Sequence, residues 1–330
     1  MRRSIKQVMT PASFQGTNSK APYFEGWYYK LVDASGNTRL AVIPGMMLDP
    51  KPENDQAFIQ VMDGETAHVV FKQYPLSAFK PEKNVLDVSV GDNHFSQQHI
   101  LLDIAQDGFS VKGEVTFGGL IPWPVTAASP GIMGWFAWIP FMQCYHGLVS
   151  FDHSLAGKLT VNGKEIDFTG GRGYIEKDWG SSFPECWIWM QTNHFTEPGT
   201  SLSASIARIP WLGSSFPGYI VGLWHQRELY RFATYNGTKV KRLEMTPEKI
   251  CWTLANRTHR LELVADRAGA GLLYAPGDAG MARRVAESLT AKVEVRLSTL
   301  KGKVLFEDEG SYAGLEVVGD VRRLGAKVQE

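Results

Sequence analysis

Tight-turn dipeptides constrain the fold of this chain more than any other feature of its sequence. Four of them lie between short apolar or alternating runs: Asp63-Gly64, Asp107-Gly108, Asn162-Gly163 and Asn236-Gly237. Asn-Gly and Asp-Gly readily take the positive φ angles that two-residue β-hairpin turns require. Residues 159–168 alternate apolar and polar on both sides of one such turn, so the sequence predicts antiparallel strands there.

Similar runs recur along the chain, at residues 26–33, 40–44, 58–62, 100–105, 110–117, 187–194, 202–209, 219–225 and 292–298. Turns, rather than long helical segments, separate most of them, which favours barrels or sandwiches. One segment differs, because residues 278–291 place Met281, Val285 and Leu289 four apart, with Asp278 as an N-cap. We therefore expect an all-β protein with one short helix near the C-terminus.

The charge balance and the cysteines limit the classes of partner. Lys plus Arg and Asp plus Glu both number 34, so no net charge attracts nucleic acid or an anionic membrane. The three cysteines are widely spaced and form no CxxC pair, which argues against a disulfide framework or structural zinc. Residues 1–10 are basic but lack the apolar core of a secretory signal, so we expect a cytoplasmic protein.

Ready-made catalytic motifs are missing from the sequence. It has no P-loop, no GxSxG elbow and no HExxH, and the glycines at 269–271 lack the third glycine of a dinucleotide fingerprint. His94 and His99 are five apart and His146 and His153 seven apart, spacings that do not point to a metal. We expect neither a metal site nor a nucleotide cofactor.

Residues 120–142 are unusually apolar and rich in tryptophan and phenylalanine. Four prolines and several glycines interrupt them, so they leave no continuous run long enough for a membrane-spanning helix. The open interpretations are a buried connection between domains, a lid over a ligand, or a weak peripheral contact with a membrane.

The densest group of unusual residues lies at 170–193. If residues 187–194 form a strand, alternation puts two indoles and two amides on one face: Trp187, Trp189, Gln191 and Asn193. Burying such a face is costly if the amides are unpaired, and exposing it to solvent is unusual because the indoles are large. A face that lines a ligand cavity avoids both problems.

A second group lies at residues 23–30, where a strand would place Glu25, Trp27 and Tyr29 on one face. Desolvation raises the pKa of a carboxyl group held among aromatic rings, and such a group can stay protonated near neutral pH. An acid of this kind is suited to protonating an alkene.

At these two segments the chain resembles the tocopherol cyclase family. The early element Phe-Glu-Gly-Trp-Tyr stands at residues 24–28, and the middle element runs from Tyr174 to Asn193, with Asp178 where the family more often has Asn. The likeness continues at residues 144–146, 153–157 and 313–316, so it covers most of the chain.

The resemblance implies two lipocalin-like β domains, which we place at residues 1–165 and 166–330. It also implies an apolar prenyl or polyene substrate. In tocopherol cyclase, an acid protonates the alkene of a prenylated quinol and the phenolic oxygen captures the cation, without a redox cofactor.

The acid candidates are Glu25, Glu176 and Asp178, with Tyr174 as a proton relay. Each has a structural alternative. Glu176 is either proton donor or orienter of the quinol hydroxyl, or it forms an ion pair; Glu25 is either donor or a buried hydrogen-bonding partner. Asp178 either completes an acid–base pair or caps a turn, and Tyr174 either relays a proton or fills space.

The residues expected to contact substrate are Trp27, Tyr29, His146, Trp179, Trp187, Trp189, Gln191 and Asn193. Indole faces attract a developing carbocation, amides bind ring oxygens, and a histidine can accept the phenolic proton. The alternatives are core packing for the indoles, a cross-strand network for the amides and a satisfied core histidine. Two rival functions stay open: a non-enzymatic carrier of an isoprenoid, quinone or lipid, and an alkene hydratase.

Overall fold

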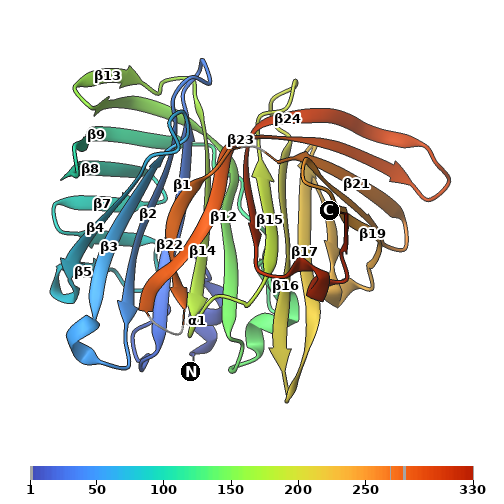
Figure 1. The fold of residues 1–330 in the computed structure, drawn as a ribbon, viewed down its shortest axis with the longest axis horizontal. Helices are drawn as coiled ribbons and strands as arrows, with labels where there is room; N and C mark the ends of the chain where they lie inside the picture. Colours follow the sequence, from blue (N-terminus) through green and yellow to red (C-terminus); the bar gives the residue numbers. More distant parts are fainter. Residues whose placement is uncertain (1–2, 268, 278–279, 330) are drawn as a thin grey trace. The chain divides into compact units, whose positions relative to one another are not determined.

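The computed structural model describes residues 3–267, 269–277 and 280–329. The chain forms two compact units, Met1–Phe183 with Leu272–Arg284, and Pro184–Gly271 with Val285–Glu330. Strands dominate both units (Figure 1). Within the described ranges the one α-helix is α1 (Ile5–Met9), which begins with a capping box between Ser4 and Gln7.

The first unit contains a twelve-stranded sheet with the order β4-β3-β2-β1-β14-β12-β9-β8-β7-β6-β5, and β13 pairs with β12. Its strands are β1 (Tyr23–Val32), β2 (Arg39–Leu48), β3 (Gln56–Asp63), β4 (Val69–Pro75), β5 (Phe79–Pro81), β6 (Asp87–Val90), β7 (Asn93–Ser96), β8 (His99–Gln106), β9 (Phe109–Gly118), β12 (Cys144–Val161), β13 (Lys164–Asp167) and β14 (Arg172–Gly180). Strand β14 lies between β1 and β12, so it joins the two halves of the sheet.

The second unit is built on an eleven-stranded sheet with the order β18-β17-β16-β15-β24-β23-β21-β20-β19-β25, and β22 pairs with β23. Its strands are β15 (Trp187–Thr192), β16 (Ser201–Trp211), β17 (Ser214–His225), β18 (Glu228–Ala233), β19 (Lys239–Met245), β20 (Lys249–Ala255), β21 (His259–Asp266), β22 (Gly271–Gly277), β23 (Gly280–Thr299), β24 (Val304–Val318) and β25 (Lys327–Val328). Residues Leu272–Arg284 of β22 and β23 belong to the first unit.

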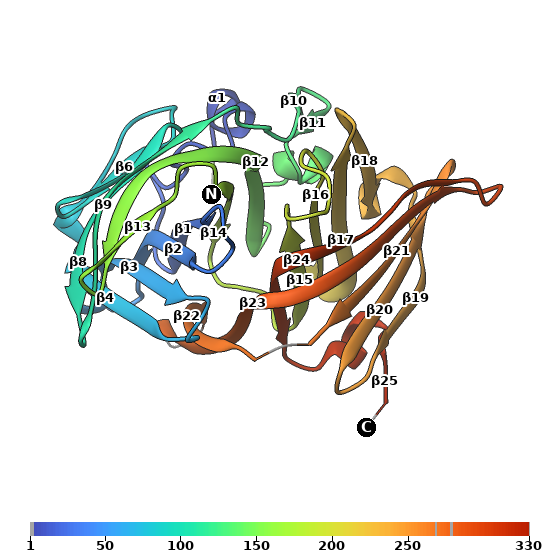
Figure 2. The same cartoon turned by 90° about the horizontal axis from the view of Figure 1, so that it is seen from above.

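Each sheet buries one face in its own apolar core. In the first unit the sheet curls (Figure 2), and one core cluster joins Val42 and Ile59 of β2 and β3 to Ile100 and Val115 of β8 and β9. In the second unit a separate cluster joins residues of β15, β16, β20, β21 and β23. The alternating pattern predicted from the sequence is the direct cause, since every second side chain of a strand points to the same face.

The predicted strand runs are all confirmed, and two of the predicted turns have the expected geometry. Asp107 and Gly108, and likewise Asn162 and Gly163, both have positive φ. At Asn236 the chain instead forms a short 3-10 helix, Thr234–Asn236, which Gly237 ends in the left-handed conformation.

The helix expected over residues 278–291 is wrong, because β23 runs from Gly280 as a strand. Met281, Val285 and Leu289 are all buried. A spacing of four also places residues on one face of a strand, since four is a multiple of two, so this pattern did not distinguish the two structures. Asp278, the expected cap, lies outside the described residues.

The two units divide at Phe183 rather than near residue 165. Residue 165 lies within β13, which pairs with β12, and β14 follows it into the middle of the same sheet. A boundary at 165 would therefore remove a central strand from the first sheet.

The apolar segment 120–142 forms the hairpin β10 (Val125–Thr126) and β11 (Ser129–Pro130), followed by the 3-10 helix η3 (Gly134–Trp138). Trp123 is buried and stacks on Phe151 at 5.5 Å between ring centroids, whereas Trp135 and Phe141 are 44% and 56% exposed. Across the described ranges, no helix has the length and apolar character needed to cross a bilayer. A peripheral membrane contact stays a prediction.

Gly180 at the end of β14 is required by close backbone packing. It has φ +156°, and a Cβ there would lie 2.1 Å from the carbonyl oxygen of Gln143. We expect Gly180→Ala to lower the free energy of unfolding of the first unit by on the order of 3 kcal/mol, because backbone atoms must shift. Urea denaturation followed by tryptophan fluorescence measures this change.

Gly108→Ala is the matched control, because Gly108 also has positive φ (+79°) but no atom lies within 4 Å of a Cβ there. Its cost should be about 1 kcal/mol, the ordinary cost of a left-handed alanine. Equal losses in the two variants would show that close packing at Gly180 is unimportant.

Candidate active site

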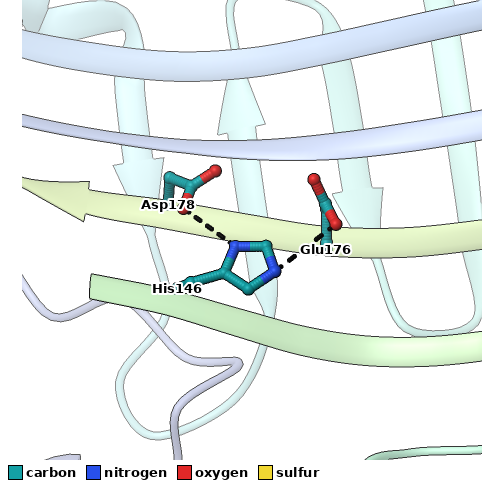
Figure 3. A group of neighbouring side chains, drawn as sticks. All are labelled: His146, Glu176 and Asp178. Atoms are coloured by element: carbon teal, nitrogen blue, oxygen red, sulfur yellow. Dashed lines mark hydrogen bonds and ion pairs between the residues drawn. The ribbon is translucent and has the colours of Figure 1, made fainter. Parts of the chain in front are cut away.

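Strands β12 and β14 bring His146, Glu176 and Asp178 together on one face of the first sheet. His146 is the register partner of Asp178, and Leu148 that of Glu176. Tyr174, Glu176 and Asp178 are spaced by two along β14, so their side chains share that face. Figure 3 shows both carboxylates extending from β14 toward the imidazole of β12.

The imidazole of His146 lies between the two carboxylates. Its Nδ1 is 2.9 Å from Asp178 Oδ1, a hydrogen bond, and its Nε2 is 3.5 Å from Glu176 Oε2, an ion-pair contact (Figure 3). Glu176 also accepts a hydrogen bond from the hydroxyl of Tyr174. Tyr174 and Glu176 are buried, while His146 and Asp178 are half-buried. A phenol, two carboxylates and an imidazole thus form one connected group.

This environment keeps His146 charged at neutral pH. Burial by itself lowers the pKa of the imidazole, but the charges of Asp178 and Glu176 and the hydrogen bond with Asp178 outweigh burial and raise the pKa to about 9. The group therefore holds a proton on His146, within reach of two carboxylates.

Cys144 adds a thiol next to the group, with its Sγ 3.9 Å from Asp178 Oδ1. Burial, and then the charge of Asp178, raise the pKa of this thiol well above its ordinary value. It stays protonated and is therefore a poor nucleophile.

Among the residues that the structure describes, these three side chains are the one group of at least three His, Cys, Asp or Glu residues placed to hold a metal ion, since their donor atoms all lie within 4.8 Å of one another. In the geometry observed, each ring nitrogen of His146 faces a carboxylate oxygen. A metal ligand needs a free nitrogen lone pair, so an ion would have to replace the proton of the imidazole.

Glu25 lies on the opposite face of this sheet and is not part of the group. Lys177 Nζ is 2.6 Å from its Oε1, and the backbone N–H of Gln15 donates to both carboxylate oxygens at 2.9 and 3.0 Å. The hydroxyl of Tyr23 donates to it as well. The structure thus gives Glu25 the role of a buried ion-pair and hydrogen-bonding partner.

Lys177 is fully buried and has partners on several sides. Its Nζ donates to the carbonyl oxygens of Pro11, at 3.1 Å, and of Ser13. It lies 4.9 Å from the ring centroid of Trp27 and 4.5 Å from that of Trp179. Burial lowers its pKa to about 8, more than Glu25 raises it.

These contacts account for three residues predicted to bind substrate. Trp27 and Trp179 face the ammonium of Lys177, and Tyr29 donates a hydrogen bond to the carbonyl oxygen of Ser96 at 3.1 Å. All three are buried, with Trp27 and Tyr29 inside the apolar core of the first unit. Contact of these three residues with substrate stays a prediction.

In the second unit, the face predicted on β15 is present. Trp187, Trp189 and Gln191 alternate with Ile188 and Met190, which belong to the core. Asn193 follows at the end of the strand and is buried like the others.

Two carboxylates near this face were not among the predicted site residues. Trp187 Nε1 donates to Glu316 Oε2 at 2.6 Å, and Glu316 is the register partner of both Trp189 and Glu287. Glu316 lies in residues 313–316, which carry part of the family resemblance, and that resemblance was the one sequence signal that could have pointed to it. Glu287 lies in the segment expected to be helical.

The family model and the sequence relatives of this chain point to the same family. A family model described as tocopherol cyclase-like matches residues 109–319. A chloroplastic tocopherol cyclase of Zea mays is 26% identical over 201 residues, which is 56% of this chain and 41% of that protein. The match thus spans less than half of the maize protein.

Solved structures share the fold. A crystal structure of CghA with Sch210972 has a TM-score of 0.60 at 10% identity, covering 90% of this chain and 89% of that one. Kievitone hydratase from Nectria haematococca has a TM-score of 0.53 at 15% identity, covering 90% and 89%. With the strand content of both sheets, these neighbours confirm the all-β, lipocalin-like architecture.

The buried ion pair generates a stability prediction. We expect Glu25→Gln to lower the free energy of unfolding by about 3 to 5 kcal/mol, because Lys177 would remain buried without its counter-charge. Chemical denaturation of the purified variant measures the change.

Glu165→Gln is the control, since Glu165 pairs with Lys158 at 2.7 Å on the exposed surface of the same sheet. Solvent screens that pair, so no measurable loss of stability is expected. A Glu25→Gln variant as stable as this control would contradict the role assigned to Glu25.

Proposed function

The chain belongs to the tocopherol cyclase-like family, and on that premise we propose that it is an enzyme that closes a ring in a hydrophobic prenylated quinol or related isoprenoid by proton transfer. The observation that carries the proposal is the position of His146 between Glu176 and Asp178, whose charges raise the pKa of its imidazole. Such a group can deliver one proton and recover one, which is the net requirement of an acid-promoted cyclisation.

The proton balance of the proposed reaction is closed without a redox cofactor. A proton passes from His146 to Glu176 and then to one alkene carbon, leaving a tertiary cation on the other. The phenolic oxygen forms its bond to that cation and loses its own proton, which returns to His146. The product is an isomer of the substrate, and the protein ends in its starting state.

Each neighbour of His146 has a separate part in this proposal. Asp178 holds Nδ1 and fixes the ring, as carboxylates commonly do for catalytic histidines. Tyr174 donates to Glu176 and stabilises the carboxylate left after proton transfer. Glu176 is buried, so its proton is delivered in a setting with little competing water.

The contacts of Trp187, Trp189, Gln191 and Asn193 with substrate stay a prediction. Their burial and alternation on β15 support it, because indole faces and amides on one wall suit an apolar ligand with polar ring oxygens. The rival functions differ in outcome: a hydratase would incorporate labelled oxygen from water, ring closure would incorporate none, and a carrier would bind without turnover.

Glu176→Gln tests the proposed proton donor. The amide is nearly isosteric but cannot deliver the proton, so we expect turnover of a prenylated quinol to fall about 10²- to 10⁴-fold. Product formation by liquid chromatography measures the rate, and circular dichroism checks the fold.

Glu165→Gln, which changes an exposed carboxylate of the same sheet, should keep the wild-type rate. Unchanged turnover in Glu176→Gln would remove this residue from the mechanism. Wild-type protein that binds a panel of prenylated quinols and converts none would contradict the enzymatic proposal as a whole.

The pKa of His146 predicts the alkaline limb of the pH profile. Because the pKa is raised to about 9, the imidazole is protonated at neutral pH and loses its proton as pH rises through 9. We expect kcat/KM to be level near neutral pH and to fall about tenfold for each pH unit well above 9.

The profile of His146→Gln should lose that limb together with most of the activity. A wild-type kcat/KM that stays constant to pH 10.5 would show that the charge on His146 is not used. Far-ultraviolet circular dichroism at each pH separates loss of activity from unfolding.

A further inference from the structure

A row of four ionisable side chains crosses strands β6 to β9 of the first unit. His94 of β7 is the register partner of Ser89 and of Leu101, and Leu101 is the partner of Glu114. Asp87 precedes Ser89 by two residues, and His99 precedes Leu101 by two. Alternation therefore puts Asp87, His94, His99 and Glu114 on one face.

This face is the one that points away from the apolar core. Val88, Phe95, Ile100 and Val115, the chain neighbours of the four residues, belong to the core cluster. The side chains of His94 and His99 are 25% and 30% exposed, so an ion from solvent can reach them.

The two histidines are hydrogen-bonded to each other through their ring nitrogens, so one of the two nitrogens carries the proton that an ion would replace. His94 Nδ1 lies 2.8 Å from His99 Nε2. The remaining nitrogen of His94, Nε2, lies 2.8 Å from Asp87 Oδ1, and that of His99, Nδ1, lies 4.0 Å from Glu114 Oε1. Each imidazole thus has a carboxylate on its outer side and the other imidazole on its inner side.

We propose that His94 and His99 form a binding site for one divalent transition-metal ion of the zinc, copper or nickel type, with Asp87 orienting the ring of His94. The proposal is independent of the cyclase function and uses none of its residues. It follows from the facing nitrogens, since imidazole is a preferred ligand of these ions.

The carboxylate of Asp87 supports this assignment. A metal-binding histidine usually donates its other N–H to a carboxylate, which fixes the tautomer and leaves the ligating nitrogen with a free lone pair. Asp87 is placed to do this for His94, because an Nε2–H that donates to Asp87 leaves Nδ1 as the ligand. Glu114 is nearest the corresponding nitrogen of His99.

The separation of the nitrogens also suits an ion after a small movement. Two nitrogens at about 2.0 to 2.1 Å from a tetrahedral ion lie about 3.3 Å apart. For an ion to bind, the shared proton must leave, the 2.8 Å separation must open by about 0.5 Å, and the rings must turn so that both lone pairs point to the ion. Both rings are partly exposed, so water can complete the coordination.

Calorimetric titration of the full chain with Zn²⁺, after removal of any affinity tag, tests the site. We expect one ion bound by wild type and at least tenfold weaker binding in His94→Gln and in His99→Gln. Asp87→Asn should weaken binding by about 10- to 100-fold, because it removes the group that orients His94.

Two controls define the location. His68→Gln changes an exposed histidine of the same unit and should leave Zn²⁺ affinity unchanged. His146→Gln should also leave it unchanged; loss of the bound ion in this variant would place it at the candidate active site and overturn the proposal.

A second readout uses Cu²⁺ in place of Zn²⁺. Electron paramagnetic resonance should report two nitrogen ligands in wild type and fewer in His94→Gln and His99→Gln. Absence of Zn²⁺ and Cu²⁺ binding by wild type, or binding that survives both histidine substitutions, would overturn the proposal.

Discussion

The placement of β14 between β1 and β12 is the constraint on which the rest of the first unit depends. Backbone pairing on both sides fixes this strand in the middle of the sheet. Because successive side chains of a strand point to opposite faces, Lys177 points into the interior and Glu176 and Asp178 point to the other face. The buried ion pair and the proposed catalytic group therefore lie on opposite faces of β14.

Electrostatics differ sharply between those two faces. On the inner side, the buried ammonium of Lys177 is neutralised by Glu25 and is hydrogen-bonded to backbone carbonyls of residues 11 and 13. A buried charge is tolerable only with such partners, so the segment before β1 is held against the sheet. On the outer side, the imidazole of His146 lies between two carboxylates.

Sequence reasoning was most reliable where its signal was local. Asn162-Gly163 takes the backbone conformation that its residue types favour, and the alternation around it gives β12 and β13. It failed at residues 278–291, since a spacing of four fits a helix and a strand equally well. A helical stripe would also need residues at intervals of three, and Met281, Val285 and Leu289 supply only the ambiguous interval.

The sequence by itself determined the β class, the positions of many turns, the shared face of Trp187 and Trp189, and, through its motifs, the family. Only the tertiary structure decided that His146 lies between Glu176 and Asp178, that Glu25 is paired with Lys177, and that His94 faces His99. The physical reason is the separation along the chain over which each effect acts. Turn chemistry and alternation act over a few residues, whereas the partner of a side chain depends on which strands pair and in what register, and the whole sheet fixes that pairing.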